Sequence, residues 1–394
     1  MKKQTQAIHL EYERRDAYDS LSVPVYNTLA YEFDNAAVMA EAFTDKIKAP
    51  DYSRVENPTV TNLERRVAAL TDAAHATAFN SGMAAISNTL MALAAQGKNI
   101  VTSKHLFGNT YALLVATLRR FGVKVRLRDL TNIEAVREAI DDDTCCVFLE
   151  ILTNPQLEVA DLKAISEVAH EKNVPLVVDS TVIPFTQFSA KSLGVDIEVV
   201  SSSKYVSGGA TSLGGLVIDY GTPYNGDFAK RLYGEMLFNF GAYMTPQVAY
   251  MQTIGLETLD ARYRVQSSNA LELAKKLHSL PQIKYVNYVG LEGNPYHELA
   301  QRQFGKTAGA MICIDLENKE ACFSFLNNLK LIHRATNLFD NRSLAIHPAS
   351  TIFGAFSESM RKSMDVKDTT IRLSVGLEDV DDLFEDIKQA VDSL

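Results

Sequence analysis

Two polar side chains stand where consecutive apolar segments of the sequence end. Residues 174–179 form an apolar run that closes on Asp179, and residues 197–204 form a second run that closes on serines and Lys204. If both runs are parallel strands of one sheet, the carboxylate and the lysine emerge at the same edge, where such sheets bind ligands. This spacing therefore predicts a ligand site that contains an acid and an amine.

Pyridoxal 5'-phosphate (PLP) needs this pair of side chains. A lysine holds its aldehyde as a Schiff base, and a carboxylate keeps its pyridine nitrogen protonated so that the ring can accept electrons. Each residue also has a purely structural interpretation, because lysines after serines usually lie in solvated loops and aspartates that end strands usually cap turns. Asp179 and Lys204 alone leave both interpretations open.

A turn around Ser81 and Gly82 adds a candidate phosphate site. It interrupts an uncharged stretch, residues 76–96, which is long enough to span a membrane but contains too many polar residues. We therefore expect a buried helix after the turn. The N–H groups at its start could donate to a phosphate or simply to an ordinary N-cap side chain. Ser201 and Ser203 could add hydroxyl groups. Three separate segments would then converge on one ligand.

Helices and short apolar strands alternate around these residues, between about residues 60 and 220. A capping box of Thr61 and Glu64 predicts a helix with Leu63, Val67 and Leu70 on one face. The alternation predicts an α/β fold with a mostly parallel sheet covered by helices on both faces. We expect strands at residues 99–103, 123–127, 145–152, 174–179 and 197–202, and helices at residues 133–140 and 162–170.

The pattern changes on both sides of this region. Residues 1–58 lack strong periodicity and contain three prolines, which predicts an extended N-terminal arm. Residues 59–255 form the predicted large domain. Residues 256–394 begin with a long helix, and strands expected at 284–288, 308–316 and 371–375 predict a smaller C-terminal α+β domain.

The composition argues against several classes of partner. A formal net charge of −9 and a pI near 5.5 provide no basic surface for nucleic acid or an anionic membrane. The four cysteines lie in apolar stretches without the spacing of metal ligands, which predicts reduced thiols and no metal site. Because residues 1–6 have no apolar core of a signal peptide, we expect a cytoplasmic protein with small-molecule partners.

The motifs together resemble one family, the Cys/Met-metabolism group of PLP enzymes, which includes the trans-sulfuration and methionine-biosynthesis enzymes. The similarity covers nearly the whole chain and implies the PLP-dependent aminotransferase-like fold (fold type I). It is carried by PVYNT at residues 24–28, YSRVENPT at 52–59, SGMAA at 81–85, NP at 154–155, VDST at 178–181, SSSKY at 201–205 and RLSVGLED at 372–379.

This resemblance implies a role for each matching residue. Lys204 would hold PLP as a Schiff base and act as general base, and Asp179 would pair with the pyridine nitrogen. Arg372, assisted by Ser343, would clamp the substrate carboxylate, because a guanidinium fork suits that group. The other implied cofactor contacts are Ser81, Gly82, Met83, Ser201 and Ser203 at the phosphate, Phe107 over the ring, Asn154 near the ring hydroxyl, and Thr181.

Tyr52 and Arg54 would reach the phosphate of a neighbouring subunit, because the resemblance places them in an arm that contacts another chain. Each active site would then need two chains. The resemblance therefore implies a homo-oligomer, and we expect a tetramer built from dimers.

Within the family, residues 255–259, 286–293, 296–300 and 342–351 most resemble the O-acetylhomoserine sulfhydrylases. Three positions depart from the family pattern. Phe107 stands where a tyrosine usually lies over the cofactor ring, Asn109 stands where methionine γ-lyase has a cysteine, and Phe353 replaces a frequent histidine.

Phe107 bears on the choice of substrate. A phenyl ring cannot protonate a departing thiolate, whereas acetate or succinate leaves unprotonated because its conjugate acid has a pKa of about 4, against about 8.5 for a thiol. We therefore expect γ-replacement on an acylated homoserine, such as O-acetylhomoserine, by sulfide or a thiol, giving homocysteine or methionine. A γ-lyase or β-lyase, a non-catalytic relative, and ordinary core packing of Phe107 stay open as alternatives.

Overall fold

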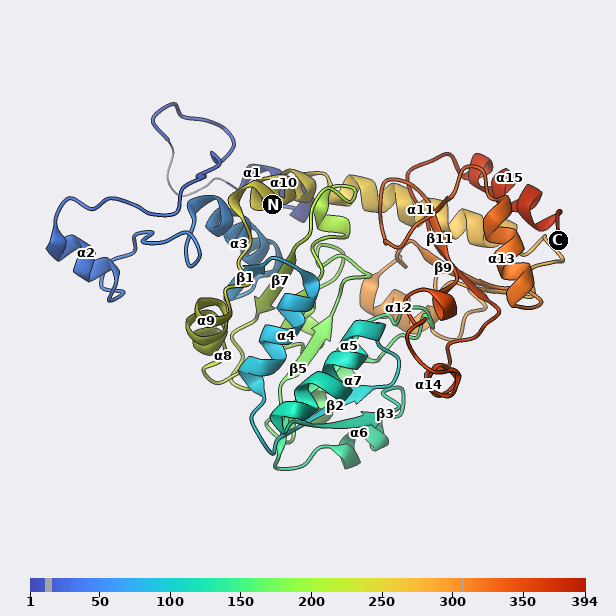
Figure 1. The fold of residues 1–394 in the computed structure, drawn as a ribbon, viewed down its shortest axis with the longest axis horizontal. Coiled ribbons are helices and arrows are strands. Elements are labelled where there is room, and N and C mark those ends of the chain that lie inside the picture. Colours follow the sequence, from blue (N-terminus) through green and yellow to red (C-terminus); the bar gives the residue numbers. More distant parts are fainter. Residues whose placement is uncertain (11–15, 307) are drawn as a thin grey trace.

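Two β-sheets organise the computed structural model, which describes residues 1–10, 16–306 and 308–394 (Figure 1). The larger sheet has the strand order β1-β7-β6-β5-β4-β2-β3. Its strands are β1 (His75–Phe79), β2 (Asn99–Ser103), β3 (Lys124–Arg128), β4 (Thr144–Glu150), β5 (Leu176–Asp179), β6 (Ile197–Val200) and β7 (Gly215–Asp219). Strand β7 pairs antiparallel with β1 and β6, and the other pairs are parallel. The predicted mostly parallel α/β fold is confirmed.

The five strands predicted in this region correspond to β2 through β6, although β4 and β6 each end two residues earlier than expected. Strands β1 and β7 were not predicted. The helices around this sheet are α3 (Pro58–Thr71), α4 (Gly82–Leu93), α5 (Gly108–Ala112), α6 (Ile133–Ala139), α7 (Leu162–His170), α8 (Phe228–Arg231), α9 (Phe238–Phe240) and α10 (Pro246–Glu257).

Alternation along the central strands divides the core between the two faces of the sheet. In β4, Val147 and Leu149 pack in the same cluster as Leu63 of α3 and the inner side of α7, whereas Cys146 and Phe148 pack with α4. All four side chains are buried because helices cover both faces, as is usual for parallel sheets.

Helix α3 begins earlier than the capping box predicts. Asn57 is the N-cap, its side chain accepts a hydrogen bond from the N–H of Thr59, and Pro58 occupies the first turn. Proline suits this position because its missing N–H would have no partner there. The prediction that Thr61 caps the helix is therefore wrong, and Glu64 accepts instead from the N–H of Ala78 on β1.

The uncharged stretch from residue 76 to residue 96 contains the end of β1, a turn and α4. Ser81 caps α4 through a hydrogen bond from the N–H of Ala84, so the helix begins after the turn as expected. Within the described residues, no helix is long and apolar enough to cross a membrane.

The smaller sheet has the order β10-β11-β12-β9-β8 and lies in the C-terminal part of the chain. Its strands are β8 (Tyr285–Asn287), β9 (Met311–Asp315), β10 (His333–Arg334), β11 (Leu344–Ile346) and β12 (Thr370–Ser374). The accompanying helices are α11 (Leu259–Leu277), α12 (His297–Phe304), α13 (Lys319–Asn328), α14 (Glu358–Ser363) and α15 (Val380–Val391). This arrangement of a second, mostly antiparallel sheet with helices agrees with the predicted α+β character.

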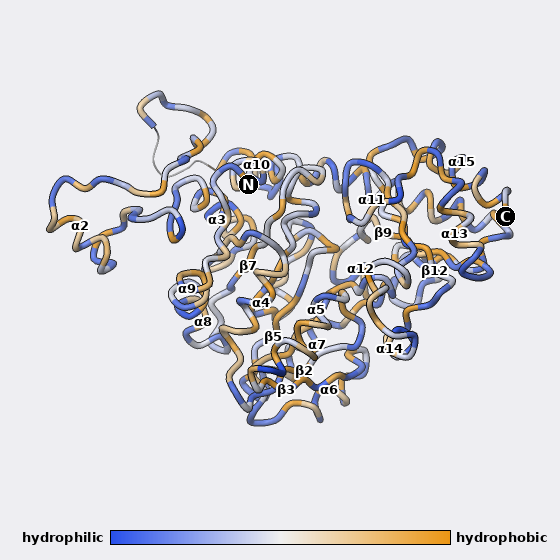
Figure 2. Tube along the Cα trace, viewed as in Figure 1, coloured by the Kyte–Doolittle hydropathy of each residue, from blue (hydrophilic) through white to orange (hydrophobic). Residues whose placement is uncertain are grey.

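The N-terminal region contains two short helices. Helix α1 (Lys3–His9) packs against α3 and α10, so it is part of the body. Helix α2 (Ala36–Ala42) projects away from the body, although it is rich in hydrophobic residues (Figure 2). Leu29, Met39 and Phe43 in this projecting part are 64%, 46% and 57% exposed.

Candidate active site

Asp179, Glu150 and Lys204 lie at the carboxyl edge of the larger sheet. Glu150 and Asp179 face each other in register at the ends of β4 and β5, and Lys204 follows the end of β6. The N–H of Thr181 donates to Asp179 over 2.9 Å, and the N–H of Ser201 donates to the Thr181 hydroxyl over 2.8 Å. These bonds hold the aspartate turn against the segment that carries the lysine.

The environment of Lys204 lowers the pKa of its amine. Burial, together with the positive charge of Arg372, lowers the pKa of Lys204 to about 8, and the negative charge of Asp179 opposes this change only in part. An amine attacks a carbonyl carbon only in its neutral form. The amine of Lys204 is therefore suited to bond an aldehyde near neutral pH.

Glu150, which is buried, and Asp179, which is partly buried, are two carboxyl groups that share one edge. Burial raises the pKa of both, and for Glu150 the charge of Asp179 raises the pKa further, well above its ordinary value. Because the hydrogen bond from Thr181 favours the ionised form of Asp179, we assign the negative charge to Asp179 and the proton to Glu150. Within the described residues Asp179 forms no salt bridge, so its environment suits a cationic ring nitrogen.

The start of α4 suits a phosphate. Its first turn leaves the N–H groups of Gly82 and Met83 without acceptors inside the helix. Gly82 also lies so close to Ser201 that an added Cβ would stand 2.6 Å from the Ser201 Cβ. A side chain at this position would fill the space between helix and serine, so the glycine keeps that space available. The lysine, the ionised aspartate and this helix start together fit PLP.

Other residues predicted to bind the cofactor make hydrogen bonds within the chain. The Ser203 hydroxyl donates to the carbonyl of Gly214 and accepts from its N–H, over 3.1 and 2.9 Å. Tyr52 and Arg54 lie on the N-terminal arm, where the Arg54 guanidinium donates to the carbonyl of Phe238 and stands 5.6 Å from the Tyr52 ring centroid. Roles for these residues at a phosphate, in the same or a neighbouring chain, stay predictions.

Phe107 is the N-cap residue of α5. Its N–H donates to the Glu150 carboxyl over 2.6 Å, which ties the start of the helix to the end of β4. Asn109 is exposed, whereas Phe353 is fully buried in a small cluster beside α5. Of the three positions that depart from the family pattern, Phe107 is the one that contacts Glu150.

The smaller domain contributes Arg372 to the same region. This buried guanidinium on β12 donates to Asn154 Oδ1 and to the carbonyl of Asn337, both over 3.1 Å. Burial lowers the pKa of Arg372 to about 10, and its Nε has no hydrogen-bond partner among the described residues. A buried cation with an unused donor is suited to bind a carboxylate.

Asn337, rather than Ser343, lies between the arginine and the lysine. Asn337 Oδ1 accepts from Lys204 Nζ over 2.9 Å. The Ser343 hydroxyl instead donates to Glu378 over 2.9 Å and accepts from the N–H of Gly376 over 2.8 Å. A substrate role for Ser343 stays a prediction. Sequence reasoning missed Asn337 because it lies in an irregular loop with no periodic signal.

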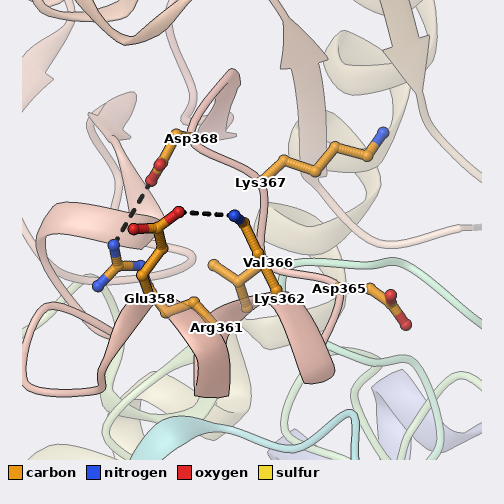
Figure 3. Close-up of a pocket in the computed structure, with 7 residues that line it drawn as sticks. All are labelled: Glu358, Arg361, Lys362, Asp365, Val366, Lys367 and Asp368. Atoms are coloured by element: carbon orange, nitrogen blue, oxygen red, sulfur yellow. Dashed lines mark ion pairs between the residues drawn. The ribbon is translucent and has the colours of Figure 1, made fainter.

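A pocket of about 290 Å³ lies at the surface beside α14, and its lining is drawn in Figure 3. Its charged side chains are largely paired with one another, since Lys362 contacts Glu358 over 2.6 Å and Arg361 contacts Asp368 over 3.9 Å. None of its lining residues belongs to the group around Asp179 and Lys204 at the strand ends, so we do not include the pocket in the candidate active site.

Comparison with known proteins shows several related enzymes. The L-methionine gamma-lyase of Fusobacterium nucleatum subsp. polymorphum is 37% identical over 99% of this chain and 98% of its own. The O-acetyl-L-homoserine sulfhydrylase of Corynebacterium glutamicum is 31% identical over 98% of this chain and 95% of its own.

A crystal structure from Campylobacter jejuni, of a protein with the proposed identity of O-acetylhomoserine (thiol)-lyase, matches with a TM-score of 0.95 and 34% identity over the full length of both chains. That structure contains a pyridoxyl-lysine phosphate. The model of the Cys/Met metabolism PLP-dependent enzymes matches residues 4–392. PLP is thus the cofactor of this protein, and the chain belongs to the Cys/Met metabolism family of PLP-dependent enzymes.

Proposed function

We propose that the protein replaces the γ-substituent of an acylated homoserine, most readily O-acetylhomoserine, by sulfide or a thiol. The products are homocysteine or methionine, together with the free acid. Phe107 is the observation that carries this proposal. Its backbone N–H bonds to Glu150 at the ends of the strands, and its phenyl ring has no proton to give to a leaving group. A carboxylate departs without such a proton, whereas a thiolate leaves poorly.

Each residue of the site has a definite task in this reaction. When bound, PLP supplies the electron sink that lets protons leave carbon atoms of the substrate. Arg372 binds the substrate carboxylate and thereby orients the α-carbon. Lys204 removes the α-proton and moves a proton at the β-carbon, because its lowered pKa of about 8 makes the neutral amine available. The negative charge of Asp179 stabilises a protonated pyridine nitrogen.

A γ-lyase is the second candidate, and it is favoured by the 37% identity to an L-methionine gamma-lyase. The two reactions share the steps assigned to Lys204 and differ only after the γ-substituent has left. A thiol adds in the transferase, whereas in the lyase water releases a 2-oxo acid and ammonia. Access of water to the site therefore decides between them.

Purified holoenzyme should be assayed with O-acetyl-, O-succinyl- and O-phosphohomoserine and with methionine, each with and without sulfide. We expect homocysteine from O-acetylhomoserine and sulfide, with little 2-oxobutyrate. Release of 2-oxobutyrate from methionine at a comparable kcat/KM would instead identify a γ-lyase.

Phe107→Tyr tests the role of the ring directly. The added phenol should raise elimination from homocysteine or cystathionine by on the order of a hundredfold relative to elimination from O-acetylhomoserine, because only the thiolate gains from a proton donor. The ratio of the two kcat/KM values is the measurement. A constant ratio, in a variant that still binds PLP, would show that Phe107 does not face the leaving group.

We also propose that the enzyme is a cytoplasmic homo-oligomer, a tetramer built from dimers. The projecting N-terminal segment supports this assembly because the hydrophobic side chains of Leu29, Met39 and Phe43 on it are exposed within one chain. Tyr52 and Arg54 on the same arm would then reach the phosphate of the neighbouring chain.

A further inference from the structure

The loop between β10 and β11 packs firmly against the segment that contains Lys204 and Tyr205. The Phe339 ring stacks on Tyr205, the residue after the lysine, with centroids 3.9 Å apart and planes 11° from parallel. The Phe339 N–H donates to the Ser374 hydroxyl over 2.7 Å, and the Asp340 carbonyl accepts from Gln266 over 2.7 Å. These contacts fix the loop to β12, to α11 and to the residue that comes after Lys204.

Asn337 in this loop contacts both cations of the site through different atoms. Its side-chain Oδ1 accepts from Lys204 Nζ over 2.9 Å, and its backbone carbonyl accepts from Arg372 over 3.1 Å. The bond to Asn337 thus sets the direction of the lysine amine. Because the same residue also binds Arg372, it couples the position of the amine to that of the expected carboxylate clamp.

The amide of Asn337 holds the Lys204 amine without adding a charge to the site. The charged groups that face the amine are Arg372 from the smaller sheet and Asp179 from the larger sheet. A carboxylate in place of the amide would favour the ammonium form of Lys204, because an opposite charge about 3 Å away stabilises the protonated amine. An amide oxygen accepts a hydrogen bond from the amine in either protonation state.

We infer that Asn337 is a positioning residue that receives the Lys204 amine whenever this amine is not bonded to the cofactor and keeps it directed at the substrate α-carbon. Oδ1 holds the amine, and the lack of charge on the amide leaves the amine able to accept the α-proton. This inference rests on the function proposed above for Lys204. It does not depend on which group leaves the γ-carbon.

The test compares Asn337→Asp and Asn337→Ala with the wild-type holoenzyme. Thr336→Asp is the matched control, since it adds the same charge at an exposed neighbouring position. The substrate is L-norvaline, which has an α-proton but no γ-leaving group, and its α-hydrogen exchange in D₂O is followed by NMR across a range of pH. Absorbance of the lysine-bound cofactor is recorded for each variant as a measure of folding and loading.

Asn337→Asp should move the acidic limb of the exchange profile to higher pH by about one unit, which is about a tenfold loss of rate at the lower pH. The rate should recover at alkaline pH. Asn337→Ala should slow exchange about tenfold at all pH values without moving the limb, because the amine loses its direction but not its pKa. Thr336→Asp should leave both the limb and the rate unchanged, and all variants should keep the cofactor absorbance.

An unmoved limb in a fully loaded Asn337→Asp enzyme would overturn the inference, as would equal shifts in Asn337→Asp and Thr336→Asp. The proposed function fails differently. If the wild-type enzyme exchanges the α-proton but forms no homocysteine from O-acetylhomoserine and sulfide, the transferase assignment is wrong while the role of Asn337 stands. Absence of any α-hydrogen exchange in the wild-type enzyme would overturn the inference, because Lys204 would then not remove the α-proton.

Discussion

The two sheets contribute unlike halves of the active-site region. The larger sheet contributes Asp179 at the end of β5, Lys204 in the turn that follows β6, and the helix start at Gly82. The smaller domain contributes Arg372 from β12 and Asn337 from an irregular loop. The groups proposed to hold the cofactor thus come from the strand ends, whereas the groups proposed to lie near the substrate come partly from a loop, which can change between relatives without altering the sheet.

The two halves also differ in charge, and the lysine stands between them. The strand ends of the larger sheet bring the carboxyl groups of Asp179 and Glu150, and the smaller domain brings the buried cation Arg372. Lys204 experiences both, so its low pKa is a property of the packed pair of domains. Substitutions in the two domains should therefore impair the enzyme in different ways.

The largest effect is expected for Lys204→Ala, because it removes both the cofactor bond and the base. Turnover should fall by about a thousandfold or more, and the absorbance of the lysine-bound cofactor should disappear. Arg54→Ala should also be inactive if the arm serves another chain. Mixing the two inactive variants should restore roughly a quarter of the sites, since a hybrid dimer holds one intact site.

Activity and absorbance of the mixture, after subunit exchange has been verified by mass, are the measurements for this prediction. No recovery would mean that each chain holds a complete site by itself. The arm would then serve the site of its own chain, together with the larger sheet.

The next effect separates the two carboxyl groups at the strand ends. Asp179→Asn removes a negative charge and should lower kcat about a hundredfold and weaken PLP binding, because a protonated ring nitrogen loses its partner. Glu150→Gln replaces a neutral acid by a neutral amide of the same shape and should cost less than about fivefold. The kcat and the dissociation constant of PLP measure both. Similar losses in the two variants would contradict the assignment of the charge to Asp179.

The smallest effect concerns a contact that joins the two halves. His105, two residues before Phe107, bonds through Nδ1 to Glu158 over 2.5 Å and through Nε2 to Asp365 of the smaller domain over 2.8 Å. Burial alone would lower the pKa of His105, but the hydrogen bonds from its ring to the two carboxylates raise it above the ordinary value. Asp365 also binds Lys104 over 2.7 Å.

Because the pKa of His105 is higher in the folded protein than in the unfolded chain, its stabilisation is complete below the unfolded value of about 6.5 and is lost as pH rises through the folded value. We expect a loss of the order of 1 kcal/mol in the free energy of unfolding. Denaturant titrations of wild type and His105→Gln at several pH values measure it. A wild-type pH dependence in the His105→Gln variant would show that other groups are responsible.

The local sequence predicted the parts of the molecule that regular elements position. The period of apolar residues located β2 through β6, and the polar residues that end two of them brought Asp179 and Lys204 to one edge. The turn at Ser81 and Gly82 likewise marked the start of α4. These features depend on neighbours along the chain, so the chain itself carries the signal.

Other features depended on details that the pattern of apolar residues does not contain. Helix α3 starts at Asn57 and Pro58 and not at the expected cap Thr61. Asn57 supplies a side-chain acceptor for the first turn, and Pro58 has no backbone N–H that would need a partner there. Strands β1 and β7 pair with each other at the end of the sheet, with His75 opposite Asp219. Partners so far apart in the chain share no local pattern, so neither strand was predicted.

Tertiary structure alone decided which side chain lies between lysine and arginine. Ser343 is committed to Glu378 and Gly376, whereas Asn337 reaches both cations because Phe339 anchors its loop on Tyr205 and on β12. An irregular loop takes its path from what it packs against, and those partners lie far away in the sequence. The sequence thus determined the chemistry at the strand ends, and the packing of two domains determined what surrounds the amine.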